Sequence, residues 1–262
     1  MRSNFHHQHV GVRAPRRPLV NAIKARFFAR AVRVGGMKTL LSIDPTLPDW
    51  WKKNAGASAG ANIEYLADPF PDARAAEPSA TRQRLGLSDD THVLVYGAIN
   101  DRKGVFELID VLAQHTGNSH GPTLVIAGAQ DEDVRAQLAA AVSKLQPAPV
   151  VMDRFISSET ELDLFSACDV VWLGYKGHYG MSGVLVLAFR FGKPVVATAD
   201  GLIGWFCRTG ELGPVVEDHS VSAINRALDD VLARRAGPVT AGHLLERNTL
   251  GQFKETLRQA IV

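Results

Sequence analysis

Apolar and polar positions alternate in a regular pattern from residue 92 onward. Short apolar runs rich in β-branched residues predict buried strands at residues 93–96, 122–127, 150–152, 169–173, 195–197 and 214–216. Between them, apolar residues recur at helical spacing, which predicts helices at residues 104–114, 132–145, 159–168, 183–191 and 221–235. A short further element is expected at residues 202–207. This alternation predicts an α/β fold with a doubly wound parallel sheet that carries helices on both faces.

Residues 1–85 carry a weaker pattern. It predicts helices at residues 19–34 (with Pro18 at the start), 44–53 and 80–85, and strands at residues 39–43 and 63–66. Residues 69–79 contain several Ala and Pro residues and indicate a linker. A closing helix is expected at residues 244–261. The front of the chain is therefore a small helical and αβ part joined to a larger sheet domain.

Basic residues are concentrated at the N-terminal end. Residues 1–43 hold nine Lys and Arg and no Asp or Glu, whereas the other 219 residues hold 20 basic and 27 acidic residues, a formal charge of −7. A local basic surface implies an anionic partner or an anionic membrane face. A nucleic-acid partner is not expected.

The predicted helix at residues 19–34 is amphipathic. Its apolar face holds Val20, Ile23, Phe27, Ala31 and Val34, and its cations Lys24, Arg26, Arg30 and Arg33 lie mostly away from that face. Two interpretations stay open. The apolar face packs against a core, which we favour, or it contacts an anionic membrane surface.

Cysteine usage and hydropathy bear on the compartment. Cys168 and Cys207 lie in or beside apolar segments and are expected to be buried thiols in a reducing compartment. No apolar run approaches the roughly 20 residues of a spanning helix, and the start of the chain lacks a signal-peptide apolar region. We therefore expect a cytoplasmic protein. The basic helix leaves open a second interpretation, in which the protein binds peripherally to the inner face of the membrane.

Residues 169–197 form a strand, a glycine-rich turn, a helix and a second strand. Gly174, Gly177, Gly180 and Gly183 occur in the turn, Ser182 is a candidate N-cap, and Gly192 is a candidate C′ residue. Such a unit directs free N–H groups and the positive end of a helix at one point, which suits a phosphate. Tightly connected α/β units also need glycines without binding anything, so the pattern alone leaves both interpretations open.

A second glycine-flanked turn follows the strand at residues 93–96. It runs from Gly97 to Gly104 and carries Arg102 and Lys103 just before a helix. Ligands of open parallel sheets bind at the carboxyl ends of the strands. Two cations beside a helix N-terminus oppose its dipole, and a bound diphosphate would relieve that conflict. The turn matches neither the dinucleotide fingerprint nor a P-loop.

Three histidines, His6, His7 and His9, are clustered near the start of the chain. Imidazoles at this spacing are able to bind a metal ion. No carboxylate or cysteine is near them in the sequence, so we expect a frayed or truncated terminus rather than a metal site. No cofactor is expected either.

Four segments occur in a familiar order: GAINDRKGVFELI, TLVIAG, ELDLFSACDVVWL and GMSGVLVLAFRFGKPVVA. Together they resemble the nucleotide-sugar-binding half of a GT-B glycosyltransferase of the family 4 type, over about residues 65–262. The resemblance implies a Rossmann-like donor domain at residues 71–262, and at residues 1–70 a remnant of the acceptor-side domain. It also implies that the closing helix crosses back to that remnant.

The resemblance implies a binding site as well. Lys103 matches the family's diphosphate-binding lysine, whereas Ala98 stands where an arginine is common, so that Arg102 either substitutes for it or is simply a neighbour. The two family carboxylates are replaced by Tyr179 and Leu187. The donor site is then expected at Gly97, Arg102, Lys103, Gly180, Ser182, Gly183 and Val184. No catalytic residue is assigned.

The expected function is transfer of a sugar from a nucleoside diphosphate sugar to an acceptor in polysaccharide or glycoconjugate biosynthesis. The alternative is a non-catalytic module that binds a nucleotide sugar or a protein, as a fragment or as one partner of a split enzyme. A nucleotide-sugar epimerase ranks lower, because its catalytic carboxylates are not recognisable in this sequence.

Overall fold

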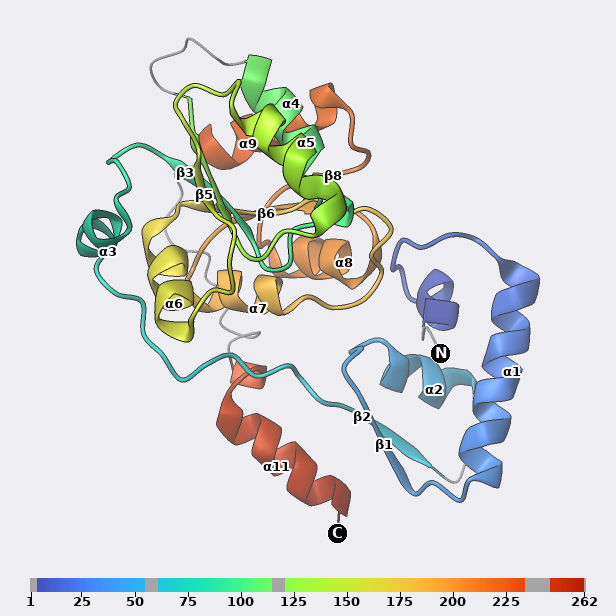
Figure 1. The fold of residues 1–262 in the computed structure, drawn as a ribbon. Coiled ribbons are helices and arrows are strands. Elements are labelled where there is room, and N and C mark those ends of the chain that lie inside the picture. Colours follow the sequence, from blue (N-terminus) through green and yellow to red (C-terminus); the bar gives the residue numbers. More distant parts are fainter. Residues whose placement is uncertain (1–3, 55–60, 115–120, 234–245, 262) are drawn as a thin grey trace.

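The computed structural model describes residues 4–54, 61–114, 121–233 and 246–261 (Figure 1). Within these residues the strands form a two-stranded sheet near the N-terminus and a six-stranded sheet in the rest of the chain. We call the parts built on these sheets the small body (residues 4–65) and the large body (residues 78–233).

All strands of the large body run parallel, in the order β5-β4-β3-β6-β7-β8. They are β3 (His92–Tyr96), β4 (Thr123–Ala127), β5 (Val150–Met152), β6 (Val170–Leu173), β7 (Val195–Thr198) and β8 (Val215–Val216). The helices are α3 (Pro78–Leu85), α4 (Val105–Gln114), α5 (Glu132–Val142), α6 (Ser158–Ala167), α7 (Gly183–Arg190), α8 (Gly201–Gly210) and α9 (Val221–Ala233). The predicted doubly wound α/β fold is confirmed.

Both faces of this sheet are buried, as the continuous apolar runs predict. In β3, Val93 and Val95 point into a core shared with α4, α5 and α9, whereas Leu94 points into a second core shared with α6, α7 and α8. Figure 1 shows these two sets of helices on opposite sides of the sheet. Both cysteines are buried free thiols, as expected.

The small body begins with a 3₁₀-helix, η1 (Asn4–His9), and α1 (Pro18–Val34). The parallel pair β1 (Thr39–Ser42) and β2 (Asn62–Tyr65) follows, with α2 (Leu47–Asn54) between them. Its core contains Phe5, Val32, Leu47, Trp50, Trp51 and Ile63. One small cluster thus holds η1, α1, α2 and β2 together.

The apolar face predicted for α1 does not pack against a core, so the interpretation that we favoured is wrong. Phe27 is 65% exposed and Val34 is 75% exposed, and Val20 and Ile23 are exposed as well. The helix instead uses a second face, with Phe28 and Val32, against the small body. Periodicity showed that one face of the helix is apolar, but it could not show which face meets the core.

The predicted linker is extended but fastened to the large body. Helix α3 begins at Pro78, where the Glu77 carboxylate caps the Ala80 N–H. Before it, the guanidinium of Arg190 donates to the Ala73 carbonyl at 2.7 Å and stacks over the Phe70 ring. The boundary between residues 70 and 71 stays a prediction.

The closing helix is shorter than predicted. Helix α11 (Leu250–Ile261) starts after a turn at Asn248, whose carbonyl accepts from the Phe70 N–H. The first residues predicted for it, 244–245, lie outside the described part. Helix α11 contacts β1, so the chain does cross back to the small body. None of the described helices has both the length and the apolar character that a membrane span requires.

Candidate functional site

The two predicted turns meet where the strand order of the large sheet reverses. Strands β3 and β6 are neighbours in the sheet, and the chain leaves them in opposite directions, toward β4 and β7. Ligands of open parallel sheets bind outside the carboxyl ends of the strands at such a switch point. The turn after β3 carries Arg102 and Lys103, and the turn after β6 leads to Ser182.

The first turn depends on glycine at two places. Gly97 has φ +95°, and its carbonyl is so close to Gly128 that a Cβ on Gly128 would lie 1.9 Å from the oxygen. The 3₁₀ turn η2 (Asp101–Lys103) then ends at Gly104, with φ +65°, where a Cβ would lie 2.1 Å from the Gly174 carbonyl oxygen. The two turns are therefore in backbone contact.

Lys103 folds back over this contact. Its Nζ donates to the Tyr96 carbonyl at 2.7 Å and to the Tyr175 hydroxyl at 2.8 Å, and it lies 4.4 Å from the centre of the Tyr175 ring. Burial, together with the neighbouring charge of Arg102, lowers the pKa of Lys103 to about 8. The guanidinium of Arg102 is exposed and has no ion-pair partner among the described residues. A cation without a carboxylate partner is available to an anion.

The second turn ends at the N-terminus of α7. Ser182 occupies the N-cap position as predicted, but its hydroxyl makes no capping bond and instead lies beside the Tyr175 hydroxyl. The N–H groups of Gly183 and Val184 have no acceptor among the described residues. Two free N–H donors and the positive end of a helix dipole are groups that suit an anion. The end predicted for this helix is confirmed as well, since Gly192 has φ +64° and the Lys193 N–H donates to the Ala188 carbonyl.

Tyr175 links the two turns, and sequence reasoning missed it. It is buried, which raises the pKa of its hydroxyl to about 12, and that hydroxyl contacts both Lys103 and Ser182. Trp172 adds a second link, because its indole N–H donates to the Lys103 carbonyl at 2.9 Å. Lys176 N–H donates to the Arg102 carbonyl at 2.8 Å. No motif marks these residues.

Two histidines at the same edge were also missed. His178 donates through Nε2–H to the Met181 carbonyl oxygen at 3.0 Å, and its ring lies edge-on to Tyr175. Burial and the charges of Arg102 and Lys103 lower its pKa, so it is neutral at pH 7. His219 lies 2.9 Å from the Gly174 carbonyl oxygen. Sequence pattern offered no signal for either one.

Not every predicted position is shaped for a ligand. Gly180 is exposed, and neither its φ nor its surroundings demand glycine. Gly183 faces open space, with nothing within 4 Å of the point where a Cβ would lie, so the approach to α7 is clear. Leu187, at a position where the resemblance implies a carboxylate, is buried in the core of the large body. The structure thus brings two parts together: the turn that begins at Gly97 and carries Arg102 and Lys103, and the N-terminus of α7.

The N-terminal histidines are not frayed, so that expectation is wrong. His6 and His7 are 0% and 2% exposed, and both contact Asp44. Asp44 is distant in the sequence but adjacent in the fold, because β1 places it under η1. His9 is exposed and remains outside the cluster.

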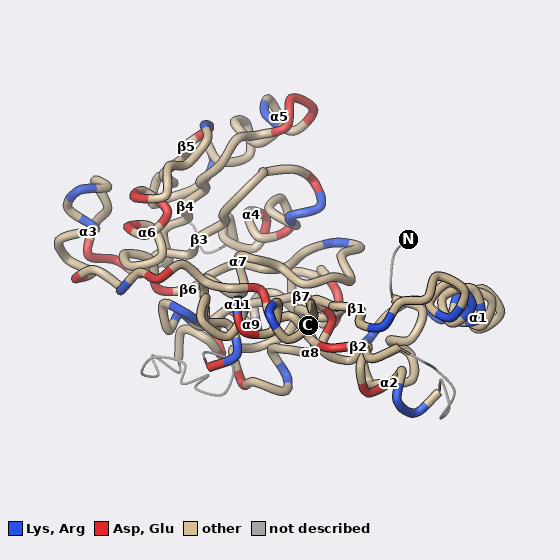
Figure 2. The backbone as a smooth tube through the Cα atoms, turned by 90° about the horizontal axis from the view of Figure 1, so that it is seen from below, with Lys and Arg blue, Asp and Glu red and all other residues tan. Residues whose placement is uncertain are grey.

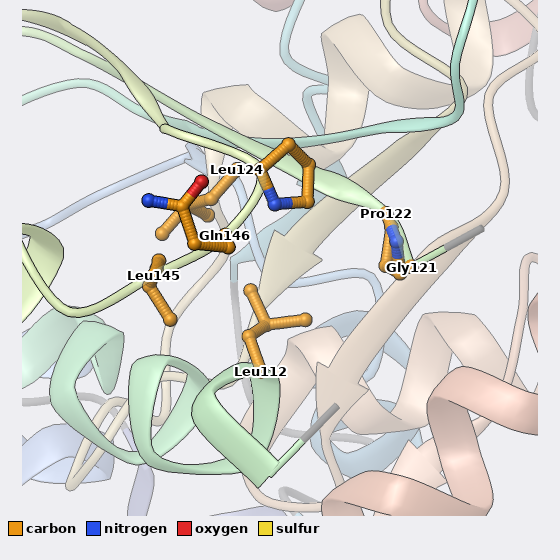
Figure 3. Close-up of a pocket in the computed structure, with 7 residues that line it drawn as sticks. Leu112, Gly121, Pro122, Leu124, Leu145 and Gln146 are labelled. Atoms are coloured by element: carbon orange, nitrogen blue, oxygen red, sulfur yellow. The ribbon is translucent and has the colours of Figure 1, made fainter. Parts of the chain in front are cut away.

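One pocket lies at the opposite edge of the large sheet (Figure 3). Leu112, Leu124 and Leu145 line it, together with Pro122, which precedes β4. It therefore lies near the amino ends of the strands, where this class of sheet does not bind its ligand. The described residues that line it include no Lys or Arg that could bind a phosphate.

Comparisons with known proteins agree with this fold. A family model described as "Glycosyl transferases group 1" matches residues 79–243, which is more than half of the chain. The curated protein alpha-D-kanosaminyltransferase from Streptomyces kanamyceticus is 31% identical over 196 residues, covering 68% of this chain and 49% of that protein. The chain thus spans about half the length of the curated relative it matches.

Solved structures are similar in fold. Anabaena Alr3699/HepE, solved in complex with UDP, matches with a TM-score of 0.70 at 18% identity, covering 89% of this chain and 66% of that one. The C-terminal domain of a group 1 glycosyl transferase (LpcC) from Francisella tularensis matches with a TM-score of 0.52 at 18% identity, covering 74% of this chain and 95% of that domain. This chain belongs to the group 1 glycosyl transferases.

Proposed function

We propose that the large body binds the diphosphate of a nucleoside diphosphate sugar, and that the protein transfers the sugar to an acceptor in glycoconjugate or polysaccharide assembly. The observation that carries this is the meeting of Arg102, Lys103 and the α7 N-terminus at the switch point. A solved relative of this fold contains UDP and glucose, which supports the choice of donor.

The chemistry that these groups offer is stabilisation of a leaving group. Negative charge grows on the diphosphate as the glycosidic bond breaks. Arg102 and Lys103 would neutralise that charge, and the N–H groups of Gly183 and Val184 would hydrogen-bond to the same phosphates. Interactions that strengthen as the charge develops raise the rate, whereas uniform binding does not.

Calorimetry tests donor binding. UDP, GDP and ADP, and then their sugars, are titrated into wild-type protein and into Lys103→Ala. We expect one nucleotide to bind and Lys103→Ala to weaken it about tenfold to a hundredfold, the range of a charge-assisted hydrogen bond. Unchanged affinity in Lys103→Ala contradicts the assignment.

Lys176→Ala is the matched control. This lysine is in the same pair of turns, but its Nζ is already paired with Asp101 at 2.6 Å and Glu107 at 2.8 Å. We expect its removal to change affinity by less than about threefold. A loss equal to that of Lys103→Ala would show that only the general charge of the region matters.

Turnover separates the enzyme from the non-catalytic module. A binding module would hold the nucleotide sugar without releasing nucleoside diphosphate, with or without acceptor extracts. Transfer or slow donor hydrolysis that Lys103→Ala abolishes would support the enzyme.

We also propose that α1 contacts an anionic membrane surface. Its exposed apolar residues Leu19, Val20, Ile23, Phe27 and Val34 fall within about 100° of the helix circumference. Arg26, Arg30 and Arg33 are exposed beside or within that sector, and Figure 2 shows the cations along α1. Residues 1–43 contain no carboxylate to repel anionic lipid. An apolar strip bordered by cations is typical of interfacial helices.

Vesicle sedimentation tests this contact. We expect the protein to bind vesicles containing phosphatidylglycerol, to bind pure phosphatidylcholine far less, and to lose binding about tenfold in Phe27→Ser. Phe155→Ser is the control, because Phe155 is 88% exposed but lies in the large body. Equal binding to both lipids, or none, contradicts the proposal. Sedimentation velocity without lipid shows whether the same face instead joins two copies.

A further inference from the structure

Three side chains converge in the interior of the small body. His6 and His7 come from η1, and Asp44 follows β1, so that 37 residues separate the nearest pair in the sequence. All three are buried. The Nε2 atoms of His6 and His7 lie 3.3 Å and 2.7 Å from the Asp44 Oδ2 atom. The three donor atoms all lie within 4.8 Å of one another.

This spacing is close to that of ligands on one metal ion. Zn²⁺ holds imidazole nitrogen and carboxylate oxygen at about 2.0–2.2 Å in a tetrahedron, so its ligand atoms are roughly 3.3 Å apart. The His6–Asp44 separation already matches, and the His7–Asp44 separation needs to open by about half an ångström. Small rotations of the side chains supply such a change.

The carboxylate is held as a metal ligand usually is. The other Asp44 oxygen, Oδ1, accepts from the Thr46 N–H at 2.9 Å and from the Thr46 hydroxyl at 2.6 Å. Ligating carboxylates are commonly fixed by hydrogen bonds of this kind. Burial opposes ionisation, but the hydrogen bonds from His6, His7 and Thr46 outweigh it and hold the pKa of Asp44 well below its usual range.

A buried anion needs a counter-charge. Within the described residues, the ion-pair partners of Asp44 are the two imidazoles, and no Lys or Arg joins them. In the form in which they bind a metal ion, two imidazoles and one carboxylate together carry one negative charge, which is costly to bury alone. A divalent cation bound to all three would compensate that charge.

We propose that His6, His7 and Asp44 bind a divalent transition-metal ion, best suited to Zn²⁺, that fastens η1 to the connection between β1 and α2. Two imidazoles and one carboxylate favour such ions over Mg²⁺ or Ca²⁺, which prefer oxygen ligands alone. The Thr46 hydroxyl, 2.9 Å from His6 Nε2, lies beside the same point. The ion acts on the structure of the small body, because the cluster is closed to substrate.

Co²⁺ and Zn²⁺ are the probes, applied to the full chain after chelator treatment and dialysis. We expect one Co²⁺ per chain, with the visible absorption of a low-symmetry, tetrahedral-like site that one equivalent of Zn²⁺ removes. Saturating Zn²⁺ should raise Tm by about 5 °C, whereas Mg²⁺ should leave it unchanged. Absence of the Co²⁺ band together with an unchanged Tm overturns the proposal, because a hydrogen-bonded cluster alone predicts that result.

Two variants separate this site from chelation by a histidine-rich end. Asp44→Asn keeps the shape and all the histidines but removes the charged ligand, so the band and the Tm rise should disappear. His9→Ala removes an exposed histidine outside the cluster and should leave both unchanged. The proposal is overturned if Asp44→Asn keeps the band and the Tm rise while His9→Ala loses them. Circular dichroism verifies folding, and His7→Gln replaces Asp44→Asn if that variant is unfolded.

Discussion

The two bodies differ in how many of their apolar positions find partners within the chain. The large body pairs six parallel strands and buries both faces of the sheet. The small body pairs two strands, and its longest helix, α1, leaves a full apolar face exposed. In the large body, the strands and helices that form the sheet also hold the turns of the candidate site in place. The small body depends more on side-chain contacts between residues far apart in the sequence, and the exposed face of α1 is available to a partner or a membrane.

Backbone contact between the turn after β3 and the residue that follows β4 gives the largest expected effect. Gly128→Ala places a Cβ 1.9 Å from the Gly97 carbonyl oxygen at a φ of +142°, so we expect the free energy of unfolding to fall by about 3 kcal/mol or more. Urea denaturation measures it. A loss below about 1 kcal/mol would mean that the turn after β3 is not held against the end of β4 as closely as described.

Gly183→Ala is the matched control for that substitution. Its Cβ meets nothing within 4 Å, and an alanine in a helix should be neutral or stabilise by a few tenths of a kcal/mol. If a phosphate approaches the α7 N-terminus, donor affinity should nevertheless fall, because the added methyl occupies its path. Full affinity in Gly183→Ala would place the phosphate elsewhere.

A pair of core truncations compares the bodies directly. Leu94→Ala in the large body and Ile63→Ala in the small body each remove a side chain that is almost fully buried, at a cost of about 2–5 kcal/mol. We expect the two variants to differ in which strands show faster amide hydrogen exchange. Leu94→Ala should accelerate exchange in β3, β4 and β6 together, whereas Ile63→Ala should accelerate it in β1 and β2 alone. Acceleration throughout the chain in both variants would show that the bodies unfold as one unit.

The pH dependence of donor binding sharpens the assignment to the large body. Lys103 has a pKa of about 8 in the free protein, so its cation is progressively lost above that pH. Since the cation is the form that binds a phosphate, the affinity for UDP should become up to about tenfold weaker by pH 9. The phosphate itself titrates near pH 6, so its charge does not change in this range. Calorimetry with UDP from pH 7 to 9.5 measures it.

Two variants give this pH profile its control. Lys103→Arg stays charged over the whole range and should flatten the profile. Arg102→Ala removes the neighbouring charge that lowers the lysine pKa, so the fall should move to higher pH even though affinity is weaker overall. A wild-type profile as flat as that of Lys103→Arg would exclude Lys103 from the site.

Sequence pattern predicted the large body closely because its information is local. Strand β3, the turn at Gly97 and the cap at Ser182 each follow from neighbouring residues and their period. Tyr175 could not be found in this way, because its role comes from contact with Lys103, 72 residues earlier. Its sequence neighbours give no sign of that contact.

The small body shows the same limit more strongly. The histidines at its start gave no reason to expect burial, because Asp44, the residue that holds them, lies 37 residues away. The apolar face of α1 was visible in the sequence, but its exposure depends on which other face meets the core. Local pattern specifies elements, and tertiary contacts decide their environment.

The smallest expected effect concerns the connection between the bodies. Arg13 pairs with Asp200 at 3.0 Å and with Glu217, and its own carbonyl accepts from the Gly201 N–H at 2.8 Å. The side chain is half exposed, so Arg13→Ala should cost less than about 1 kcal/mol, and the backbone bond remains. We expect faster hydrogen exchange in η1 with β3 unchanged. Arg84→Ala breaks a pair with Asp163 inside the large body and should leave η1 unchanged. Equal exchange in η1 for both variants would show that the small body holds its position by apolar contacts, such as that of Val12 with the core of the large body, rather than by this ion pair.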